Sequence, residues 1–289
     1  MWKRLLTHFL LLATCALFAM PLLLMLGGSL KTQEELARNP FGLIPETWTF
    51  ENYILVFSSM PLAAYLRNTV LLCVGCVAGS LLSCSLVAYA ISRIGWRGSR
   101  FLFITVMVTL LLPWQITMIP RFVLLSELGL YNSLWAIILP CFLGEAFYIF
   151  LLRQFFLSIP QQLLDAGRLD GLGHWGLFWQ IMIPLSKPAL VAVALFQFIE
   201  TWNNFGGPLL YLSDPQKFPV AYGLERFVSS YADQTNLLLA AAVIFSLPAL
   251  ALLWHKGTLS KVSPLPVSKV EHELRHQIKI RRNCDWRWP

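Results

Sequence analysis

Charged side chains are scarce in this chain. Asp, Glu, Lys and Arg together make up 13% of its 289 residues, while hydrophobic residues make up 57%. A soluble domain usually carries about 25% charged residues, so this composition excludes an ordinary soluble protein and indicates a polytopic membrane protein. The length leaves room for about six spans of ~20 residues with modest loops. It leaves none for a large soluble domain, so nucleotide hydrolysis would require another chain.

Recognisable catalytic and disulfide patterns are also missing. There is no HExxH and no GxSxG, and the five histidines are scattered, so a membrane-embedded enzyme has little support. The six cysteines form no framework. Cys73 and Cys76 make a CxxC inside a continuous apolar run, which favours small buried apolar residues over a redox pair.

The net charge of +7 does not indicate a nucleic-acid partner. The basic residues lie in loops on one side and in the tail, which is the asymmetry that sets the orientation of a membrane protein. Arg93, Arg97 and Arg100 share one short loop without any acid, which places that loop in the cytoplasm. Alternation then predicts that both termini are cytoplasmic.

Six apolar stretches predict an all-α fold with six transmembrane helices. They cover about residues 5–26, 68–91, 101–119, 133–156, 189–212 and 237–254. The first exceeds a typical signal-peptide core and has no clear cleavage site, so an uncleaved span is expected. Gly75 and Gly79 in the second favour close helix contact. Prolines exclude one long helix from outer loop 29–66.

A polar stretch, residues 158–188, interrupts the apolar pattern between the fourth and fifth spans. Ser158 fits a helix N-cap, with Gln161 three residues later as in a capping box. Gly171 suits a left-handed helix end. A second helix is expected from about His174 to Ile183, ending before Pro184. Such a hairpin either presents a docking surface or only covers the bundle.

This stretch resembles the cytoplasmic signature loop of type I ABC import permeases. That loop reads Glu-Ala-Ala, two residues, Asp-Gly-Ala, then about nine residues to an apolar-Pro pair. Here the matching residues are Asp165, Ala166, Gly167, then Asp170, Gly171, and later Ile183 and Pro184. Two residues depart from the pattern, because Asp165 is one methylene shorter than glutamate and Gly167 replaces alanine at a helix cost of roughly 1 kcal/mol.

The flanking segments are similar to the carbohydrate branch of that family, with the smaller maltose-system permease subunit as a near likeness. The matching segments include AYAISRIGWRG, LLPWQITMIP, LRQFFLSIP and WNNFGGPLLYL. The resemblance covers about residues 5–253 and implies a type I ABC importer permease core.

The resemblance also implies a division of the chain. Residues 1–66 would hold the first transmembrane helix and an outer loop, and residues 67–257 the permease core, with the coupling loop at 158–188. Residues 258–289 would form a basic cytoplasmic tail beyond the likeness, as a native extension, a reading-frame artefact or a truncation.

The partners implied are a second permease subunit in a heterodimer, two ATPase subunits at the cytoplasmic face and an extracytoplasmic substrate-binding protein. The bacterial inner membrane would house the complex. ATP and Mg would be used by the ATPases, and this chain would bind no cofactor. The ATPase-coupling residues would be Asp165, Ala166, Gly167, Asp170, Gly171 and Pro184.

The fifth span holds the most polar cluster within the membrane. Gln197, Glu200, Thr201 and Asn204 follow i, i+3, i+4, i+7 spacing, so they share a helix face, with Trp202 on a neighbouring face. Polar groups at membrane depth usually face a cavity or a partner, and these beside aromatic surface suit a sugar pathway. Hydrogen bonding between helices is the alternative.

Glu145 in the fourth span is expected to find a partner in the bundle interior. A proton-coupled secondary transporter with Glu145 or Glu200 as relay is the alternative function. Outer loops 29–66 and 213–236 would face the binding protein, with contacts from Tyr211, Tyr222 and Tyr231.

Overall fold

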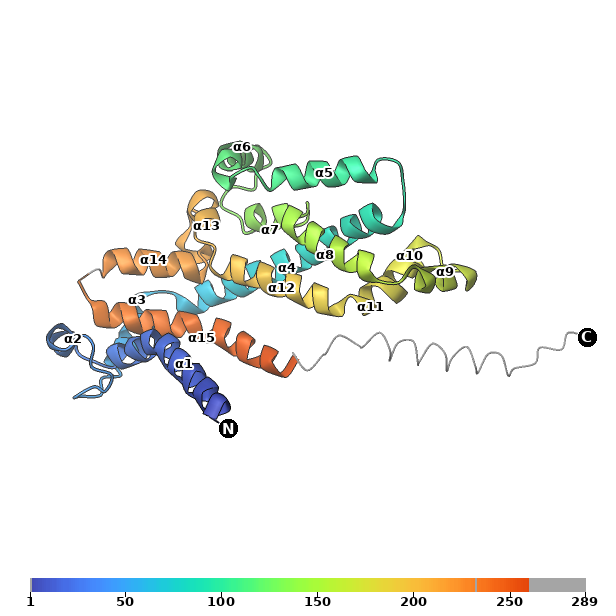
Figure 1. The fold of residues 1–289 in the computed structure, drawn as a ribbon. Coiled ribbons are helices and arrows are strands. Elements are labelled where there is room, and N and C mark those ends of the chain that lie inside the picture. Colours follow the sequence, from blue (N-terminus) through green and yellow to red (C-terminus); the bar gives the residue numbers. More distant parts are fainter. Residues whose placement is uncertain (1, 232, 260–289) are drawn as a thin grey trace, which may run out of the picture. The chain divides into compact units, whose positions relative to one another are not determined.

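Helix α4 is the element against which most of the others pack. In the computed structural model, which describes residues 2–231 and 233–259, α4 covers Leu62–Arg93 and is the longest helix, with 32 residues. The α7, α8 and α12 helices all lie along it (Figure 1). Its two ends therefore define the two ends of the helical bundle.

The other elements are helical too, and no described residue is in a strand, which confirms the all-α prediction. In chain order the helices are α1 (Trp2–Ser29), α2 (Gln33–Arg38), α3 (Glu51–Ser59), α4, α5 (Ser99–Thr109), α6 (Trp114–Glu127), α7 (Trp135–Cys141), α8 (Ala146–Ser158), α9 (Gln161–Leu169), α10 (His174–Gly176), a π-helix (Leu177–Met182), α11 (Ile183–Leu185), α12 (Lys187–Trp202), α13 (Gly206–Tyr211), a 3-10 turn (Pro215–Lys217), α14 (Val220–Ser230) and α15 (Thr235–Leu259).

Several helices are long and apolar enough to cross a membrane. Three do so alone, namely Arg4–Ser29, Leu62–Arg93 and Trp135–Ser158. Among the described residues there are also two bent pairs, α5 with α6 and His174–Leu185 with α12, which bring the number up to five if each pair is one span, and Thr235–Pro248 is a shorter apolar helix. Each predicted stretch thus coincides with an apolar helix or bent pair, which is consistent with six spans.

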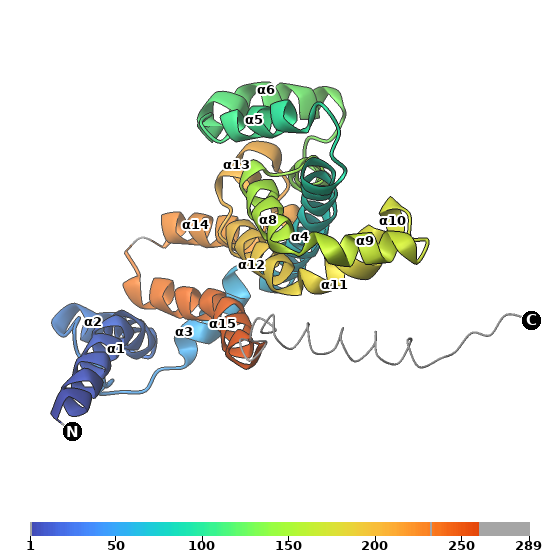
Figure 2. The ribbon, with the colours of Figure 1, turned by 45° about the vertical axis from the view of Figure 1, so that its right-hand side comes forward.

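The third predicted span is divided into two helices. Leu110 to Pro113 separate α5 from α6, and the chain bends by 101° between them. Both helices lie at the top of the view in Figure 2. Pro113 has no amide hydrogen and disfavours helical geometry in the residue before it, so the chain breaks there. The fourth span is interrupted between Cys141 and Ala146, where Gly144 takes a φ of +93°.

The first unit of the chain, Met1–Ala249, contains two hydrophobic clusters along α4. One surrounds its first half and includes Tyr65, Leu72 and Phe218. The other surrounds its second half and includes Leu152, Phe156 and Phe178. The single helix α4 therefore connects the core beneath α14 with the core beneath the 158–188 loop.

Glycines let α7 approach α4 closely, as the sequence predicts. A methyl group at Gly75 would lie 3.0 Å from Ile138, and one at Gly79 would lie 2.6 Å from the Phe142 ring. Ser83 Oγ adds a hydrogen bond of 3.1 Å to the Cys141 carbonyl. The thiols of Cys73 and Cys76 are free and buried, which confirms their interpretation as small core residues.

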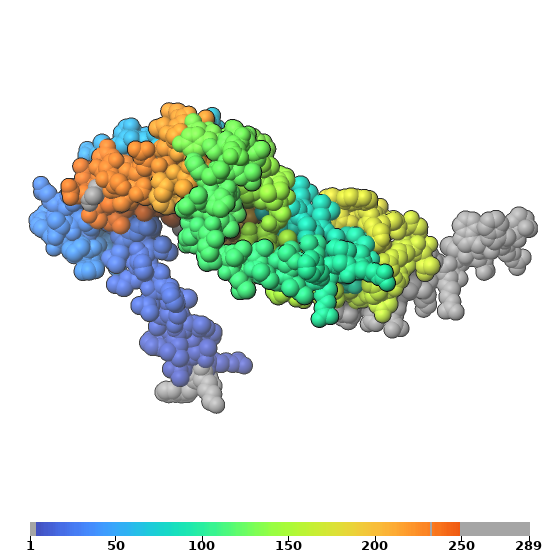
Figure 3. Space-filling view, turned by 90° about the horizontal axis from the view of Figure 1, so that it is seen from above, coloured from blue at the N-terminus to red at the C-terminus, as the bar shows by residue number. Residues whose placement is uncertain are grey.

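The N-terminal helix contributes little to this core. None of the most apolar window of α1 is buried within the chain, and the helix projects from its neighbours in the first unit (Figure 3). Its apolar surface needs lipid or another chain around it. The boundaries expected at 66/67 and 257/258 stay predictions, and residues 260–289 of the expected tail lie outside the described residues.

Candidate functional site

The first helix of the 158–188 loop begins later than predicted. Ser158 is the last residue of α8, and its hydroxyl donates to the Phe155 carbonyl at 2.7 Å instead of capping α9. Pro160 occupies the N-cap, and α9 starts at Gln161. The expected capping box is therefore wrong, because the proline two residues further on sets the start.

The end of α9 is as predicted. Gly171 has a φ of +85°, in the left-handed region that glycine enters without strain. Its amide donates to the Arg168 carbonyl at 3.0 Å, and the Leu172 amide donates to the Gly167 carbonyl at 2.9 Å. These two bonds form a Schellman motif, which terminates the helix sharply and sends the chain back.

The returning helix is longer than expected and is wound differently. α10, the π-helix and α11 follow one another without interruption from His174 to Leu185. Pro184 lies inside α11, so the expected end before this proline is wrong. The wider π turn precedes Pro184, and π segments often accompany functional sites. A 77° bend then leads into α12.

Gly167 has a packing role that the sequence pattern does not reveal. A methyl group there would lie 2.7 Å from Ile181 Cδ1 and 2.8 Å from Leu177 Cδ2. The missing side chain lets α9 lie directly on the π-helix, and an alanine would require these two side-chain ends to move. Leu164, one turn earlier, is buried in the same contact.

Asp165 is held on the exposed surface of α9. Its Oδ1 accepts from Arg168 Nη1 at 3.0 Å and from Gln161 Nε2 at 3.1 Å. Ala166 and Asp170 are exposed beside it, Asp170 as the helix C-cap. The helix thus presents a fixed acidic side chain and a small residue at one surface.

The tip of this loop is unusually apolar for an exposed segment. Leu169 is 91% exposed, and the Trp175 and Trp179 rings are also exposed. Large apolar side chains gathered on a surface commonly mark an interaction site. Tyr89 of α4 supports the loop from beneath, with its ring centroid 5.3 Å from that of Phe178 and its hydroxyl 3.4 Å from His174 Nδ1.

The polar cluster of α12 divides between two neighbouring helices. Gln197 and Thr201 are buried and face α4, where Ser80 Oγ donates to Gln197 Oε1 at 2.6 Å and Gln197 Nε2 donates to Thr201 Oγ1 at 2.9 Å. This is the helix-to-helix hydrogen bonding that the sequence left as the alternative. Their pathway role stays a prediction.

Glu200 lies on the other side of α12. Its Oε2 accepts a 2.8 Å hydrogen bond from the Tyr148 hydroxyl of α8, while the residue remains exposed. Glu145 is exposed as well, at the interruption between α7 and α8, so the expectation of a bundle-interior partner is wrong. Its backbone instead contacts the Cys84 thiol, whose sulfur is 3.2 Å from the Glu145 amide nitrogen.

The remaining predicted pathway residues lie at or beyond the end of α12. Trp202 is its last residue, buried and stacked on Phe198 with ring centroids 5.5 Å apart. Asn204 follows the helix, and its Oδ1 accepts from the Gly207 amide in the first turn of α13 at 3.0 Å. Among the described residues no three His, Cys, Asp or Glu side chains gather as a metal site.

The sequence does not predict the roles of two residues, Tyr148 and Arg93. Tyr148 holds Glu200 but carries no local signal beyond being polar within an apolar run. Ser80, which holds Gln197, is predicted only as one of the small residues that favour close helix contact. In the sequence Arg93 is recognised only as a positive charge of a loop. In the structure its guanidinium donates hydrogen bonds to residues at the junction of α8 and α9.

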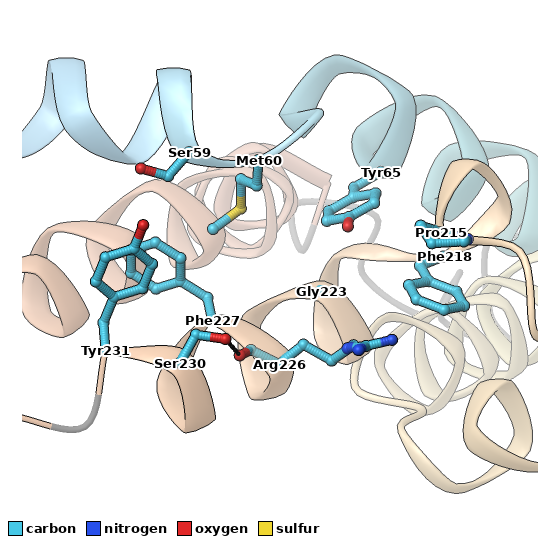
Figure 4. Close-up of a pocket in the computed structure, with 10 residues that line it drawn as sticks. All are labelled: Ser59, Met60, Tyr65, Pro215, Phe218, Gly223, Arg226, Phe227, Ser230 and Tyr231. Atoms are coloured by element: carbon cyan, nitrogen blue, oxygen red, sulfur yellow. Dashed lines mark hydrogen bonds between the residues drawn. The ribbon is translucent and has the colours of Figure 1, made fainter.

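A cavity of about 260 Å³ lies at the opposite end of α4 from the loop. Aromatic side chains from α4 and α14 line it, with Arg226 Cζ 5.6 Å from the Phe218 ring centroid (Figure 4). Tyr231 also lines it, whereas Tyr211 and Tyr222 are buried. The expectation that these two tyrosines offer surface contacts is therefore wrong.

The structure is an apolar helical bundle with a helix-glycine-helix loop at one end and a polar cluster between its helices. These features are typical of a membrane-embedded transport component. The profile of the family described as "Binding-protein-dependent transport system inner membrane component" matches residues 75–260. The chain belongs to this family. It is a multi-pass inner-membrane permease subunit of an ABC transporter, a class of subunit that is not itself an enzyme.

Similar proteins support this assignment. The chain is 36% identical over 235 residues to an arabinooligosaccharides transport system permease protein, AraQ, of Halalkalibacterium halodurans, covering 80% of this chain and 84% of that protein. It is 31% identical over 247 residues to a diacetylchitobiose uptake system permease protein, NgcG, of Streptomyces coelicolor, covering 84% and 82%.

The fold also resembles that of solved transporters. A chain in a crystal structure of a bacterial ABC transporter involved in alginate import superposes with a TM-score of 0.76 at 24% identity. The match covers 90% of this chain and 96% of that one. The type I permease fold predicted from the sequence is thereby confirmed.

Proposed function

We propose that this chain forms half of the translocation pore of an ATP-driven importer for an oligosaccharide. A second permease subunit supplies the other half in a heterodimer, and a substrate-binding protein delivers the sugar from outside. The names of similar permeases, which refer to arabinooligosaccharides and diacetylchitobiose, support the substrate class. The description of the family as binding-protein-dependent supports the substrate-binding protein as a partner.

The observation that carries the coupling role is the exposed apolar tip of the 158–188 loop. Leu169 and Trp175 are exposed in the described chain, and Asp165, also exposed on α9, is held by Arg168. Such a surface fits the cleft of an ATPase subunit. The coupling residues would be Asp165, Ala166, Gly167, Asp170, Gly171 and Pro184, in a core of residues 67–257.

The loop is connected to the pathway by the two helices that flank it. α8 enters the loop and carries Tyr148, and α12 leaves it and carries Glu200, which accepts the Tyr148 hydrogen bond. Closure of two ATPases on ATP and Mg would move α9, and the packed helices would transmit that movement. ATP and the loaded binding protein then shift the population between two states.

In this arrangement the loop and both termini lie in the cytoplasm. The unopposed arginines of the loop after α4 support this orientation. Glu200 and Asn204 are the best placed of the predicted pathway residues, because Glu200 is exposed and Asn204 is half-buried, whereas Gln197 and Thr201 are buried.

Reconstitution into liposomes tests the proposal. The chain would be co-purified with its permease partner and ATPases, and uptake of labelled arabino-, chito- and alginate oligosaccharides measured with the binding protein outside. We expect uptake of one class that requires ATP on the ATPase side and survives a protonophore. Uptake by the chain alone, driven by a proton gradient, would contradict the proposal.

A further inference from the structure

The side chain of Arg93, at the end of α4, donates hydrogen bonds to both helices that meet at the start of the 158–188 loop. Its Nε donates to the Phe156 carbonyl of α8 at 3.2 Å, and Nη2 donates to the same carbonyl. Nη2 also donates to the Ile159 carbonyl at 2.5 Å, and Nη1 donates to Gln161 Oε1 at 2.9 Å. One guanidinium thus contacts the last turn of α8, the connection and the first residue of α9.

The connection itself is built to bend. Only Ile159 and Pro160 separate the two helices, and Ile159 is extended, with φ −73° and ψ 128°. Pro160 has no amide hydrogen to continue a helical ladder. Without an outside contact, the angle between α8 and α9 would depend on the backbone torsions of these two residues and on the packing of α9 against the π-helix.

Arginine suits this place for two physical reasons. The last carbonyls of a helix lack intrahelical partners and form the negative end of its dipole, so a cation there is favourable. The planar guanidinium also offers five donors in a rigid fork, which can reach three acceptors at once. A lysine would bring the charge without the fork.

We infer that Arg93 is a positioning residue that fixes the angle at which α9 leaves α8, so that movement of α9 is passed to α4 and α8 together. This role rests on the proposed coupling function of the loop. It differs from that of Arg97, an exposed arginine of the neighbouring loop for which no such contacts are seen in the described chain. Charge alone would make the two arginines equivalent.

The test compares Arg93→Gln with Arg97→Gln in the assembled transporter, with Arg93→Lys as the conservative variant. Hydrogen exchange of amides 164–169, which can donate within α9, reports on this helix, and amides 178–183 of the same loop serve as an internal reference. Solute imported per ATP hydrolysed reports on coupling. Arg93→Gln should speed exchange of the α9 amides at least tenfold and lower the coupling ratio at least threefold, with Arg93→Lys intermediate and Arg97→Gln unchanged.

A second variant covers the case in which Arg93→Gln does not assemble. Gln161→Ala removes the bond to Nη1 and also the bond from Gln161 Nε2 to Asp165 Oδ1 within α9. It should speed α9 exchange at least threefold, while Arg168→Gln, which removes the other bond to the Asp165 carboxylate, and Gln162→Ala, on the exposed neighbouring residue, should not. Equal exchange and coupling ratios in the Arg93 and Arg97 variants, or in the Gln161 and Gln162 variants, would overturn the inference. If wild-type uptake needs no ATPase, the proposed function fails, and the exchange comparison still decides the role of Arg93.

Discussion

The Tyr148 hydroxyl of α8 donates a 2.8 Å hydrogen bond to Glu200 Oε2 of α12, and so joins the two helices that enter and leave the 158–188 loop. α8 and α12 also pack against each other and against α4. A change in the angle of one of these helices would therefore move the other helix at the depth of the polar cluster.

Replacing Tyr148 with phenylalanine should impair transport without dissociating the complex. The variant keeps the ring and leaves the Glu200 carboxylate without this donor, and membrane hydrogen bonds of this kind contribute about 0.6–2 kcal/mol. We expect initial uptake to fall roughly three- to tenfold. Co-purification of the ATPases should stay at the wild-type level. Tyr131→Phe, at an exposed residue between α6 and α7, is the control, and equal uptake in the two variants would contradict the pathway role.

The buried pair of Ser80 and Gln197 should matter for stability. Ser80→Ala leaves the buried Gln197 Oε1 without its donor, which costs about 1–3 kcal/mol. Thermal unfolding in detergent should show the loss, and Ser58→Ala, on the exposed surface of α3, should not. Adding Gln197→Leu to Ser80→Ala should recover part of the stability that Ser80→Ala loses. A double variant that is no better than the single one would show that the pair does not interact as described.

Gly171 should be more sensitive to alanine than Gly173. Both glycines have open space where a methyl group would go, and only Gly171 has a positive φ, of +85°. Left-handed geometry costs an L-residue roughly 1–2 kcal/mol. Gly171→Ala should therefore lower the amount of ATPase that co-purifies by several-fold, and Gly173→Ala should leave it unchanged. Equal retention in both variants would show that the sharp helix end is not needed for docking.

Gly223 is a close contact in the wall of the cavity in Figure 4. A methyl group on this residue of α14 would lie 2.3 Å from ring atoms of Tyr65 on α4. Overpacking of a core typically costs about 1–3 kcal/mol, so Gly223→Ala should lower the unfolding temperature. Combining it with Tyr65→Leu should restore part of the loss. No loss in the single variant would show that α14 can shift freely away from α4.

The sequence predicts well those features that follow from local chemistry. Gly171 ends α9 because few other residues tolerate a positive φ there, and Gly75 and Gly79 mark the close approach of α7 to α4. The all-α class and the apolar stretches follow from composition. These signals need no knowledge of neighbouring helices.

Features decided by packing could not be predicted in the same way. Ser158 and Pro160 are both residues that often begin a helix. In the structure α8 continues through Ser158, and Arg93 of another helix donates to the Ile159 carbonyl that follows. The sequence does not reveal this contact. Periodicity placed Gln197 and Glu200 on one face of α12, while two different neighbours, α4 and α8, divide that face. The π-helix before Pro184 has no simple sequence rule.

Cross-linking at the tip of α9 tests whether the 158–188 loop docks on an ATPase subunit. Leu169→Cys would carry a short photoactivatable cross-linker in the assembled transporter, and Ser229→Cys, exposed on α14, would carry the same reagent as the control. Position 169 should cross-link to an ATPase subunit, and position 229 should not. Absence of an ATPase cross-link at 169 in an active transporter, or an equal yield at 229, would contradict this docking.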